Sequence, residues 1–317
     1  MPALSYVIPV RATRPVDELT PYLAWLAREV DDVVVVDGSD AAVFAAHHHA
    51  WHASVRHVGV DADVASPMGK VGGVLTGLRL ARHRHVIVAD DDVRYDRETL
   101  ARMEDLLRDA AVVRPQNVFA SWPWHALWDA GRSLIARAFG GDWPGTLGVD
   151  RDLVLHAGGY AGDVMFENLE LVRTIEAAGG RHVRADDVYV ARLPPSTAQF
   201  VNQRVRQAYD ELARPGRLAV QLALLPAVVL GGRRVALVVG ATAIALAEIG
   251  RRRAGGAQHF RARATVLAPA WVAERAVTSW LAVASRLRHG GIRYGGTTLK
   301  RAATSRRDLA RSIAARA

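Results

Sequence analysis

The sequence predicts an α/β protein in which helices flank a mostly parallel sheet, followed by an apolar, helical C-terminal region. Two observations predict the sheet: short β-branched runs alternate with helical segments in the first half of the chain, and these runs are continuously apolar, as in strands buried on both faces. A third observation, the change to long uncharged stretches after residue 217, sets the C-terminal region apart. We therefore expect one domain at 1–214 and a helical region at 215–317.

The individual elements follow from the apolar pattern and from the residues that end helices. Strands are expected at 4–9, 33–36, 54–58, 86–89 and 112–114, and helices at 17–30, 71–82, 97–109, 167–178 and 199–213. Gly179-Gly180 and Pro215-Gly216 are typical of the ends of the last two helices. Tryptophan, glycine and proline are frequent from 121 to 148, so an irregular insert that covers a site is expected there.

The C-terminal region contains two uncharged apolar runs, 218–230 and 235–247, separated by Gly-Gly-Arg-Arg. Each run is shorter than the ~20 residues that cross a bilayer as one helix. Short spans, a re-entrant hairpin, interfacial helices and a pair of soluble core helices all fit this pattern. The segment 266–287 places Trp271 and Trp280 beside charged residues, which is typical of an amphipathic interfacial helix. We favour attachment to the cytoplasmic side of the cell membrane.

Composition narrows the function classes. The absence of cysteine excludes disulfides, thiolate metal sites and cysteine nucleophiles. The net charge of +9 indicates an anionic partner. Because basic residues flank the apolar runs, and no basic groove with interleaved aromatic residues occurs in the first half, a membrane surface is favoured over nucleic acid. No signal peptide is recognisable at the amino terminus, so a cytosolic start is expected.

Three carboxylates, Asp90, Asp91 and Asp92, directly follow the apolar strand expected at 86–89. Ligands of open α/β sheets bind at the carboxyl edge of the strands, and Mg²⁺ or Mn²⁺ prefers oxygen ligands. A divalent ion held there can neutralise a diphosphate and make it a better leaving group. The structural alternative is an acidic loop that caps the next helix.

Two further segments have both a ligand-binding and a structural interpretation. Asp37 ends the second strand, where it can contact a nucleotide's base or ribose, or simply begin a turn and a helix cap. Lys70 lies in a glycine-rich segment before a helix, where backbone N–H groups and the helix dipole can face a phosphate. The spacing is not that of a P-loop. Lys70 also stands out because only two of the 41 basic residues are lysines.

Other candidates lie at the sheet edge and in the expected insert. Gln116 follows the strand at 112–114 and can touch a donor sugar, or it belongs to a turn. Trp124 and His125 either stack on a sugar or lipid acceptor or form a hydrophobic plug. The run His47-His48-His49 does not have the spacing of a metal site on a helix, so a solvated helix end is expected.

A series of segments in the right order resembles family 2 glycosyltransferases of the GT-A fold. These are a first strand ending in Ile8-Pro9-Val10, then VVVVDGSD, GKVGGVLTGL and VIVADDDV, then GGY at 158–160 before FENLEL at 166–171, and QRVRQ at 203–207. The segment GGIRYGG at 290–296 is similar to one in the ceramide-glucosyltransferase-like branch of that family. The resemblance extends over nearly the whole chain.

The resemblance implies an inverting glycosyltransferase that moves a sugar from a nucleotide-diphosphate sugar, expected to be a UDP-sugar, to a hydroxyl of a lipid or lipid-linked acceptor. Asp90 and Asp92 would hold Mg²⁺ or Mn²⁺ on the diphosphate, with Asp91 between them. Asp37 would contact uracil or ribose. The remaining residues that it implies are Pro9 for the donor side, Gln203, Arg204 and Arg206 for the donor's diphosphate or the acceptor, and Gly159 and Tyr160 for the acceptor side.

Two departures from the family pattern bear on mechanism. This chain has Glu167-Asn168 where the family has Glu-Asp, and asparagine cannot act as a base. We therefore expect Glu167 to be the general base, with Asp163 as the alternative. Gln207 stands in place of a tryptophan associated with polymerising members, which argues against a processive polysaccharide synthase.

Three other functions are compatible with the same motifs. A nucleotidyltransferase has a related fold, although its glycine-rich signature follows the first strand, whereas here the similar segment lies at residues 66–70. A non-catalytic sugar-nucleotide-binding or scaffold protein, or an inactive relative, is also possible by sequence. Metal-dependent hydrolysis of a UDP-sugar separates the enzyme from the scaffold.

Overall fold

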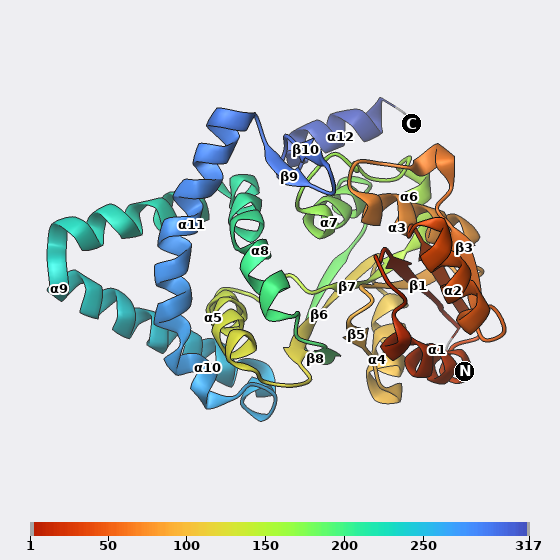
Figure 1. Cartoon of the computed structure of the whole chain (residues 1–317), viewed down its shortest axis with the longest axis horizontal. Coiled ribbons are helices and arrows are strands. Elements are labelled where there is room, and N and C mark those ends of the chain that lie inside the picture. Colours follow the sequence, from red (N-terminus) through yellow and green to blue (C-terminus); the bar gives the residue numbers. More distant parts are fainter. Residues whose placement is uncertain (1–2, 316–317) are drawn as a thin grey trace.

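The computed structural model describes residues 3–315 and consists of an α/β domain joined to a group of C-terminal helices. In Figure 1 the sheet and its covering helices occupy the right of the view, and the long helices α9 and α11 stand at the left. The helices α5 and α8 lie between them. This arrangement confirms the predicted fold class.

The described residues form one mixed sheet of eight strands, in the order β3-β2-β1-β4-β7-β6-β8-β5. Its strands are β1 (Ser5–Val10), β2 (Asp32–Asp37), β3 (Arg56–Gly59), β4 (His85–Ala89), β5 (Val93–Arg94), β6 (Val112–Phe119), β7 (Thr146–Asp150) and β8 (His182–Arg192). Strands β3, β2, β1 and β4 are parallel, and β7 runs antiparallel between β4 and β6. All five strands predicted from the sequence are present, while β5, β7 and β8 were not predicted.

The predicted helices of the first domain are also present. They are α1 (Thr20–Glu29), α3 (Gly69–Leu80), α4 (Arg97–Leu107), α7 (Glu167–Ala177) and α8 (Thr197–Tyr209), and the structure adds α2 (Ala41–Trp51) and α6 (Arg151–His156). Hydrogen bonds from capping side chains explain where two of these helices begin. Asp40 accepts a hydrogen bond from Val43 N at 3.0 Å to begin α2, and Asp96 forms a capping box with Thr99 at the start of α4.

Glycines in α3 bring this helix unusually close to the sheet. A Cβ at Gly77 would collide with the side chain of Val7, and one at Gly73 would lie 2.9 Å from Cβ of Pro9. Pro9 is partly buried at the end of β1. The glycine-rich segment that suggested a phosphate loop therefore serves close helix–sheet packing along α3, and only its start faces the cavity described below.

The prediction that the segment 121–148 is irregular was wrong, although part of it does line the cavity described below. The segment forms the helix α5 (Trp124–Ala138) and the strand β7. Its glycine has a packing role, because a Cβ at Gly131 would lie 3.0 Å from Cα of Ala268 on α11. Small residues at a helix–helix contact and an antiparallel strand both weaken the periodic signals from which the elements were predicted.

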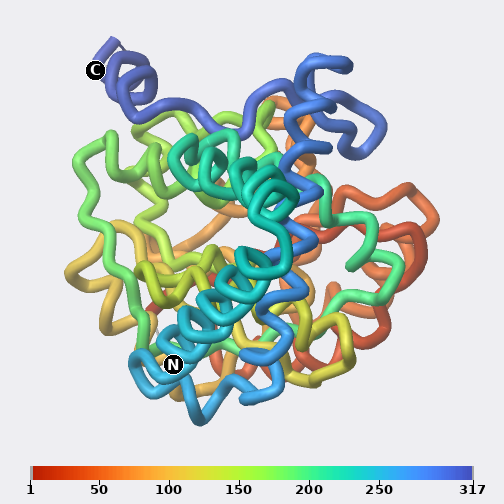
Figure 2. The backbone as a smooth tube through the Cα atoms, turned by 90° about the vertical axis from the view of Figure 1, so that its left-hand side faces the viewer, coloured from red at the N-terminus to blue at the C-terminus, as the bar shows by residue number. Residues whose placement is uncertain are grey.

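The C-terminal region begins with α9 (Pro215–Arg252), which consists of two helical segments joined by a bend at Gly232, where φ is +59° and ψ is −151°. The bend separates the two predicted apolar runs. The helices α10 (Ala262–Val266) and α11 (Ala268–His289) follow. In Figure 1 the two halves of α9 and the helix α11 form the three sides of a triangle. Figure 2 looks onto this face, with α9 crossing in front of the domain. Among the described residues, one helical segment, Pro215–Gln258, is long and apolar enough to cross a membrane.

The last described residues return to the α/β domain. The hairpin of β9 (Ile292–Tyr294) and β10 (Thr297–Leu299) precedes α12 (Arg306–Ala314), which packs on α7. Phe166 N donates a hydrogen bond to the carbonyl of Ala302 at 2.8 Å, and Thr304 N donates to Glu170 at 2.6 Å. The segment after residue 290, which the sequence placed with the helical region, thus packs on the α/β domain.

Candidate active site

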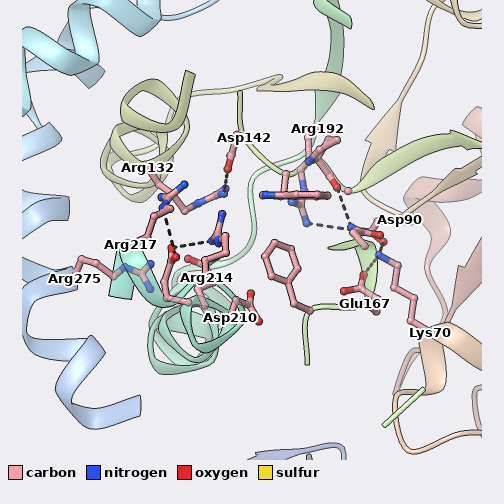
Figure 3. A pocket seen from close by; sticks show the side chains of 17 residues that line it. Lys70, Asp90, Arg132, Asp142, Glu167, Arg192, Asp210, Arg214, Arg217 and Arg275 are labelled. Carbon is pink, nitrogen blue, oxygen red and sulfur yellow. Dashed lines mark hydrogen bonds and ion pairs between the residues drawn. The ribbon is translucent and has the colours of Figure 1, made fainter. Parts of the chain in front are cut away.

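A cavity of about 150 Å³ opens at the carboxyl end of β4, where the α/β domain meets the C-terminal helices. Figure 3 shows two groups of charged side chains facing it, one around Asp90 and one around Arg214 and Arg275. Its walls come from α3, the residue after β4, α5, the loop before β7, α7, β8, α8 and the turn after it, α9 and α11. The lining residues are Lys70, Asp90, Arg132, Asp142, Trp143, Pro144, Gly145, Phe166, Glu167, Asn168, Arg192, Gln207, Asp210, Glu211, Arg214, Arg217 and Arg275.

Lys70 joins the two predicted acidic positions of the site. Its Nζ lies 2.5 Å from Oδ1 of Asp90 and 2.5 Å from Oε1 of Glu167. Burial by itself would lower the pKa of Lys70, but the two carboxylates outweigh it and raise the pKa above its usual value. The lysine is therefore held in its charged form between the end of β4 and the start of α7.

Arg192, at the end of β8, contacts two of the three consecutive carboxylates. Its Nε lies 2.8 Å from Oδ2 of Asp92, and its second guanidinium nitrogen lies 3.7 Å from Oδ2 of Asp90. The other oxygen of Asp92 is buried and has no hydrogen-bond partner. Burial, followed by the charges of Asp92 and Asp90, raises the pKa of Asp91 to about 6. Crowded oxygen donors with one orphaned atom fit a hard divalent cation such as Mg²⁺ or Mn²⁺.

Glu167 and Asp163, the two predicted alternatives for the base, occupy different environments. Glu167 lines the cavity. Asp163 lies outside it, is 55% exposed at its side chain, and pairs with Arg301 at 2.6 Å. Asn168, which replaces the family's second acid, donates a hydrogen bond to the carbonyl of Pro144 at 2.9 Å and so holds the loop before β7. The geometry therefore favours Glu167 as the group that can reach a bound hydroxyl.

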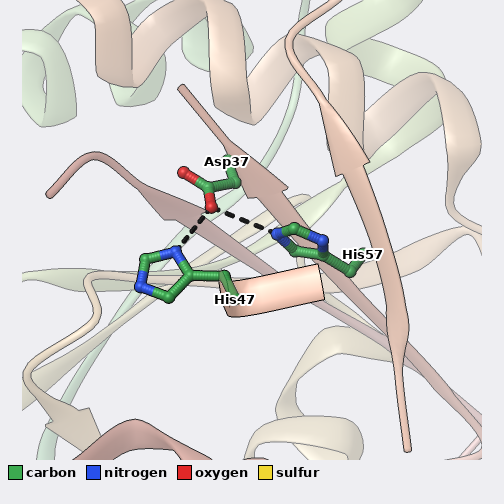
Figure 4. A group of neighbouring side chains, drawn as sticks. All are labelled: Asp37, His47 and His57. Atoms are coloured by element: carbon green, nitrogen blue, oxygen red, sulfur yellow. Dashed lines mark hydrogen bonds and ion pairs between the residues drawn. The ribbon is translucent and has the colours of Figure 1, made fainter. Parts of the chain in front are cut away.

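Asp37, predicted to contact the nucleotide, lies in a buried cluster with two histidines (Figure 4). Its Oδ2 contacts Nδ1 of His47 at 2.7 Å and Nε2 of His57 at 3.1 Å, while Oδ1 accepts a hydrogen bond from Ser39 N at 2.9 Å. Burial would raise the pKa of Asp37, but the hydrogen bonds from His57, Ser39 and His47 outweigh it and hold it below its usual range. Its carboxylate presents no exposed surface to a ligand in this structure.

The same three residues are spaced closely enough to suggest a metal site, but the hydrogen bonds argue against one. Val16 N donates to Nε2 of His47 at 3.0 Å, so Nδ1 of that ring carries the proton and donates it to Asp37. A metal at Nδ1 would place a protonated Nε2 against the Val16 N–H group. The cluster therefore joins α2, β2 and β3, and His47 is a buried residue of that cluster where the sequence predicted a solvated helix end.

The predicted residues of α8 take three different positions. Arg204 is buried, donates to Asp129 at 2.8 Å and lies 3.6 Å from Glu274, so it ties α8 to α5 and α11. The Arg206 guanidinium lies 5.7 Å from the ring centroid of Tyr294 on β9. Gln203 is partly buried, and neither it nor the two arginines is among the cavity-lining residues. Gln207, singled out only as a departure from the family, does line the cavity.

None of the remaining predicted residues is among those that line the cavity. Gln116 is buried and accepts a hydrogen bond from Arg137 at 2.9 Å, away from the cavity wall. Gly159 has a φ of +80° and Tyr160 is buried beside Glu167, whose charge adds to burial in raising the tyrosine pKa. Trp124 is exposed at the start of α5, and its ring, like that of the buried His125, packs on Phe200.

Sequence reasoning missed most of the cationic lining. Arg192 lies at the end of β8. The alternation of apolar and polar residues within 182–192 favours a strand, but this strand was not predicted. Asp210 was also missed. In the structure, burial and then the charge of Glu167 raise the pKa of Asp210 well above its usual range. No local signal marks the other missed residues, because they converge from separate elements. These are Arg132, Asp142, Arg214, Arg217 and Arg275.

No protein-family model matches the sequence, and no curated protein matches it. The structure is similar to that of the mannosyltransferase PcManGT from Pyrobaculum calidifontis in complex with GDP-Man and Mn²⁺, with a TM-score of 0.54 and 20% identity over 88% of this chain and 87% of that one. The fold is GT-A. In this GT-A chain the carboxylates that follow β4 lie at the carboxyl edge of the sheet.

Two structures of glucosyl-3-phosphoglycerate synthase from Mycobacterium tuberculosis, with Mn²⁺ and UDP, also overlap with this GT-A chain. Their identities are 15% and 16%, and both cover 63% of this chain, with TM-scores of 0.41 and 0.42. They cover 75% and 73% of the synthase chains.

Proposed function

We propose that this protein is a metal-dependent, inverting glycosyltransferase that moves a sugar from a nucleotide-diphosphate sugar, with UDP as the nucleotide, to a hydroxyl of a lipid or lipid-linked acceptor. The observation that carries the proposal is the convergence of Asp90, Asp92, Arg192, Lys70 and Glu167 at one sheet edge of a GT-A fold. Carboxylates for a metal, cations for a diphosphate and a carboxylate for a proton are the groups that this reaction requires.

Asp90 and Asp92 are the residues that would hold Mg²⁺ or Mn²⁺. The ion, when bound, supplies positive charge to the diphosphate as it leaves. Arg192 and Lys70 are placed to add to that charge from the protein side. Both cations already contact the carboxylates of the site, so they are held in position before a donor binds.

Glu167 is placed to take the proton of the acceptor hydroxyl. The hydroxyl oxygen then forms a bond to the anomeric carbon, the bond from that carbon to the diphosphate oxygen breaks, and its electron pair leaves with the nucleoside diphosphate. A single displacement of this kind inverts the anomeric configuration. Lys70 contacts Glu167 at 2.5 Å, so this lysine orients the base and couples it to the donor side.

A lipid acceptor is supported by the exposed apolar surface of α9. Val229 and Leu230, beside the bend, are 71% and 88% exposed. Adjacent large apolar side chains that are this exposed to water are typical of a surface that contacts a membrane or a partner. Arg233 and Arg234 follow the bend, and a charged side chain at the bilayer centre costs about 3 kcal/mol or more. We therefore infer that α9 attaches to the cytoplasmic face of the cell membrane with these arginines at the level of anionic head groups.

The membership of the ceramide-glucosyltransferase-like branch remains part of this proposal. Its support is the segment at 290–296, which contains β9 and the turn that leads to β10 and which brings Tyr294 close to Arg206. The nucleotidyltransferase alternative rests on the segment at 66–70, which in the structure leads into α3 and not into the helix after the first strand.

Calorimetric titration of the detergent-solubilised protein with a panel of nucleotide sugars, in Mn²⁺ or Mg²⁺ and then in EDTA, tests this function. We expect micromolar binding of one donor that EDTA abolishes. The Asp92→Ala variant should lose the metal-dependent binding and keep its thermal unfolding temperature, whereas Asp105→Ala, an exposed change on α4, should bind as the unmodified protein does. Absence of binding by any nucleotide would favour the scaffold or inactive alternatives.

A further inference from the structure

A buried arginine on α11 has no counter-ion of its own. Arg275 lines the cavity and is 1% exposed, yet its Nε and one terminal nitrogen have no hydrogen-bond partner. Among residues 3–315 it forms no ion pair within 4 Å, and its nearest aromatic contact is the ring of Trp271, at 5.3 Å from the guanidinium carbon. Burial is the main reason that its pKa is lowered.

The two acids whose charges act on Arg275, Glu274 and Glu211, each contact another arginine, and each keeps one buried oxygen without a hydrogen-bond partner. Glu211 lies 2.8 Å from Arg214 and 3.5 Å from Arg217. Asp142 lies 2.6 Å from Arg132. Figure 3 shows Arg275, Arg217 and Arg214 facing this side of the cavity, with Asp90, Lys70 and Arg192 at the other side. One end of the cavity therefore contains guanidinium groups that the protein's own carboxylates do not fully pair.

An unpaired guanidinium is costly to bury, and removal from water is favourable only when an anion or further hydrogen bonds compensate it. Guanidinium groups offer several donors in a planar fork that matches a phosphate. The orphaned donors of Arg275, together with Arg214 and Arg217, have the composition of a phosphate-binding site. This site is separate from the carboxylate end, where Asp90 and Asp92 would hold a metal on the donor.

We propose that Arg275, Arg214 and Arg217 bind a phosphate group carried by the acceptor. The proposal rests on the proposed function, and it specifies the acceptor as a phosphorylated molecule. Arg217 is on α9 and Arg275 is on α11, the two helices whose exposed apolar surfaces would face lipid. A lipid phosphate can therefore be held by its head group in the cavity while its chain follows these helices.

The test is a binding measurement with geranyl phosphate, geraniol and inorganic phosphate as probes. We expect geranyl phosphate to bind at least tenfold more tightly than geraniol. Arg275→Met should weaken geranyl phosphate binding at least tenfold and leave nucleotide-sugar affinity unchanged. Arg288→Met, an exposed change on the same helix, is the matched control and should not alter either affinity. If inorganic phosphate competes as well as geranyl phosphate does, the phosphate site stands and the acceptor is a soluble phosphorylated molecule.

Two outcomes would overturn the proposal. One is geranyl phosphate affinity unchanged in Arg275→Met; the other is a loss of nucleotide-sugar affinity alone, which would assign these arginines to the donor. Arg217→Gln changes a partly exposed side chain and provides a second variant if Arg275→Met does not fold. Failure of the proposed function is distinguishable, because a protein that binds geranyl phosphate through Arg275 but binds no nucleotide sugar keeps the phosphate site and loses the glycosyltransferase assignment.

Discussion

Lys70 and Glu167 are 97 positions apart in the chain, yet the ammonium group of one lies 2.5 Å from a carboxylate oxygen of the other. The same ammonium group contacts Asp90 at 2.5 Å. One side chain thus connects the start of α3, the end of β4 and the start of α7. The proposed base and the proposed metal ligand share a single counter-ion.

Replacement of Lys70 by methionine should therefore affect both halves of the site. Without the ammonium group, Glu167 and Asp90 face each other as like charges, and a diphosphate loses one stabilising cation. We expect kcat to fall at least 100-fold in an assay with the donor identified by titration. Lys300→Met, which changes the only other lysine at an exposed position, is the control and should retain activity.

The two candidate bases are separated by a pair of matched variants. Glu167→Gln should spare donor binding and reduce transfer by 100-fold or more, because an amide cannot accept the hydroxyl proton. Asp163→Asn breaks an exposed ion pair with Arg301. This variant should transfer sugar at the unmodified rate, and its free energy of unfolding should change by no more than about 1 kcal/mol. Full transfer by Glu167→Gln and loss of transfer by Asp163→Asn would reverse the assignment.

Close packing of α3 on β1 predicts a strong effect of a single methyl group. Gly77→Ala should destabilise the protein by about 1–3 kcal/mol in urea unfolding, because the new Cβ collides with Val7. Gly216→Ala is the control: a Cβ at that position of α9 meets no atom within 4 Å. Since alanine is the better helix former, we expect the control to be neutral or slightly stabilising. Equal effects at both positions would contradict the packing argument.

The lowered pKa of Glu248 predicts that the stability of the folded protein depends on pH. Hydrogen bonds from Arg251 and Arg252 lower its pKa to about 2 in the folded protein. A lowered folded pKa stabilises the folded state at pH values above the unfolded pKa of about 4.3, and this contribution is lost as the pH falls towards 2. Glu248→Gln should therefore lower Tm at pH 6 and have little effect near pH 2. Glu18→Gln, at an exposed position with no ion pair among the described residues, should shift Tm equally little at both values.

The bend of α9 predicts where the protein meets a membrane. Simultaneous change of Val229 and Leu230 to aspartate should abolish co-flotation with vesicles that contain anionic lipid, because both exposed apolar side chains at the bend are lost. Val201→Asp, at an exposed apolar position of α8, is the control and should leave flotation intact. Flotation of the double variant at the level of the unmodified protein would favour a soluble helical region.

The sequence was sufficient to predict those parts that depend on local pattern. The strands β1, β2 and β4 lie in continuous apolar runs, and α4 has a clear capping signal, so they were predicted close to their observed ends. The strand β6 was predicted at 112–114 but extends to Phe119, where the apolar run is interrupted by arginine, proline, glutamine and asparagine. Asp90, Asp91 and Asp92 were placed at the correct sheet edge because a buried strand directly precedes them. By contrast, α5 was missed because Gly131 and its tryptophans were interpreted as an irregular segment, although the glycine permits contact with α11.

What the sequence by itself determined is the α/β fold, the order of its main elements and the acidic edge of the sheet, since each depends on residues close together in the chain. Tertiary structure decided which charges share the site. In the folded chain Asp37 is buried in a cluster with two histidines, and Arg192 forms an ion pair with Asp92. Arg275 was buried beside arginines of α9 and, among the described residues, forms no ion pair within 4 Å. The physical reason is that pairing and burial of charges depend on distances between separate elements, and periodicity along the chain does not contain those distances.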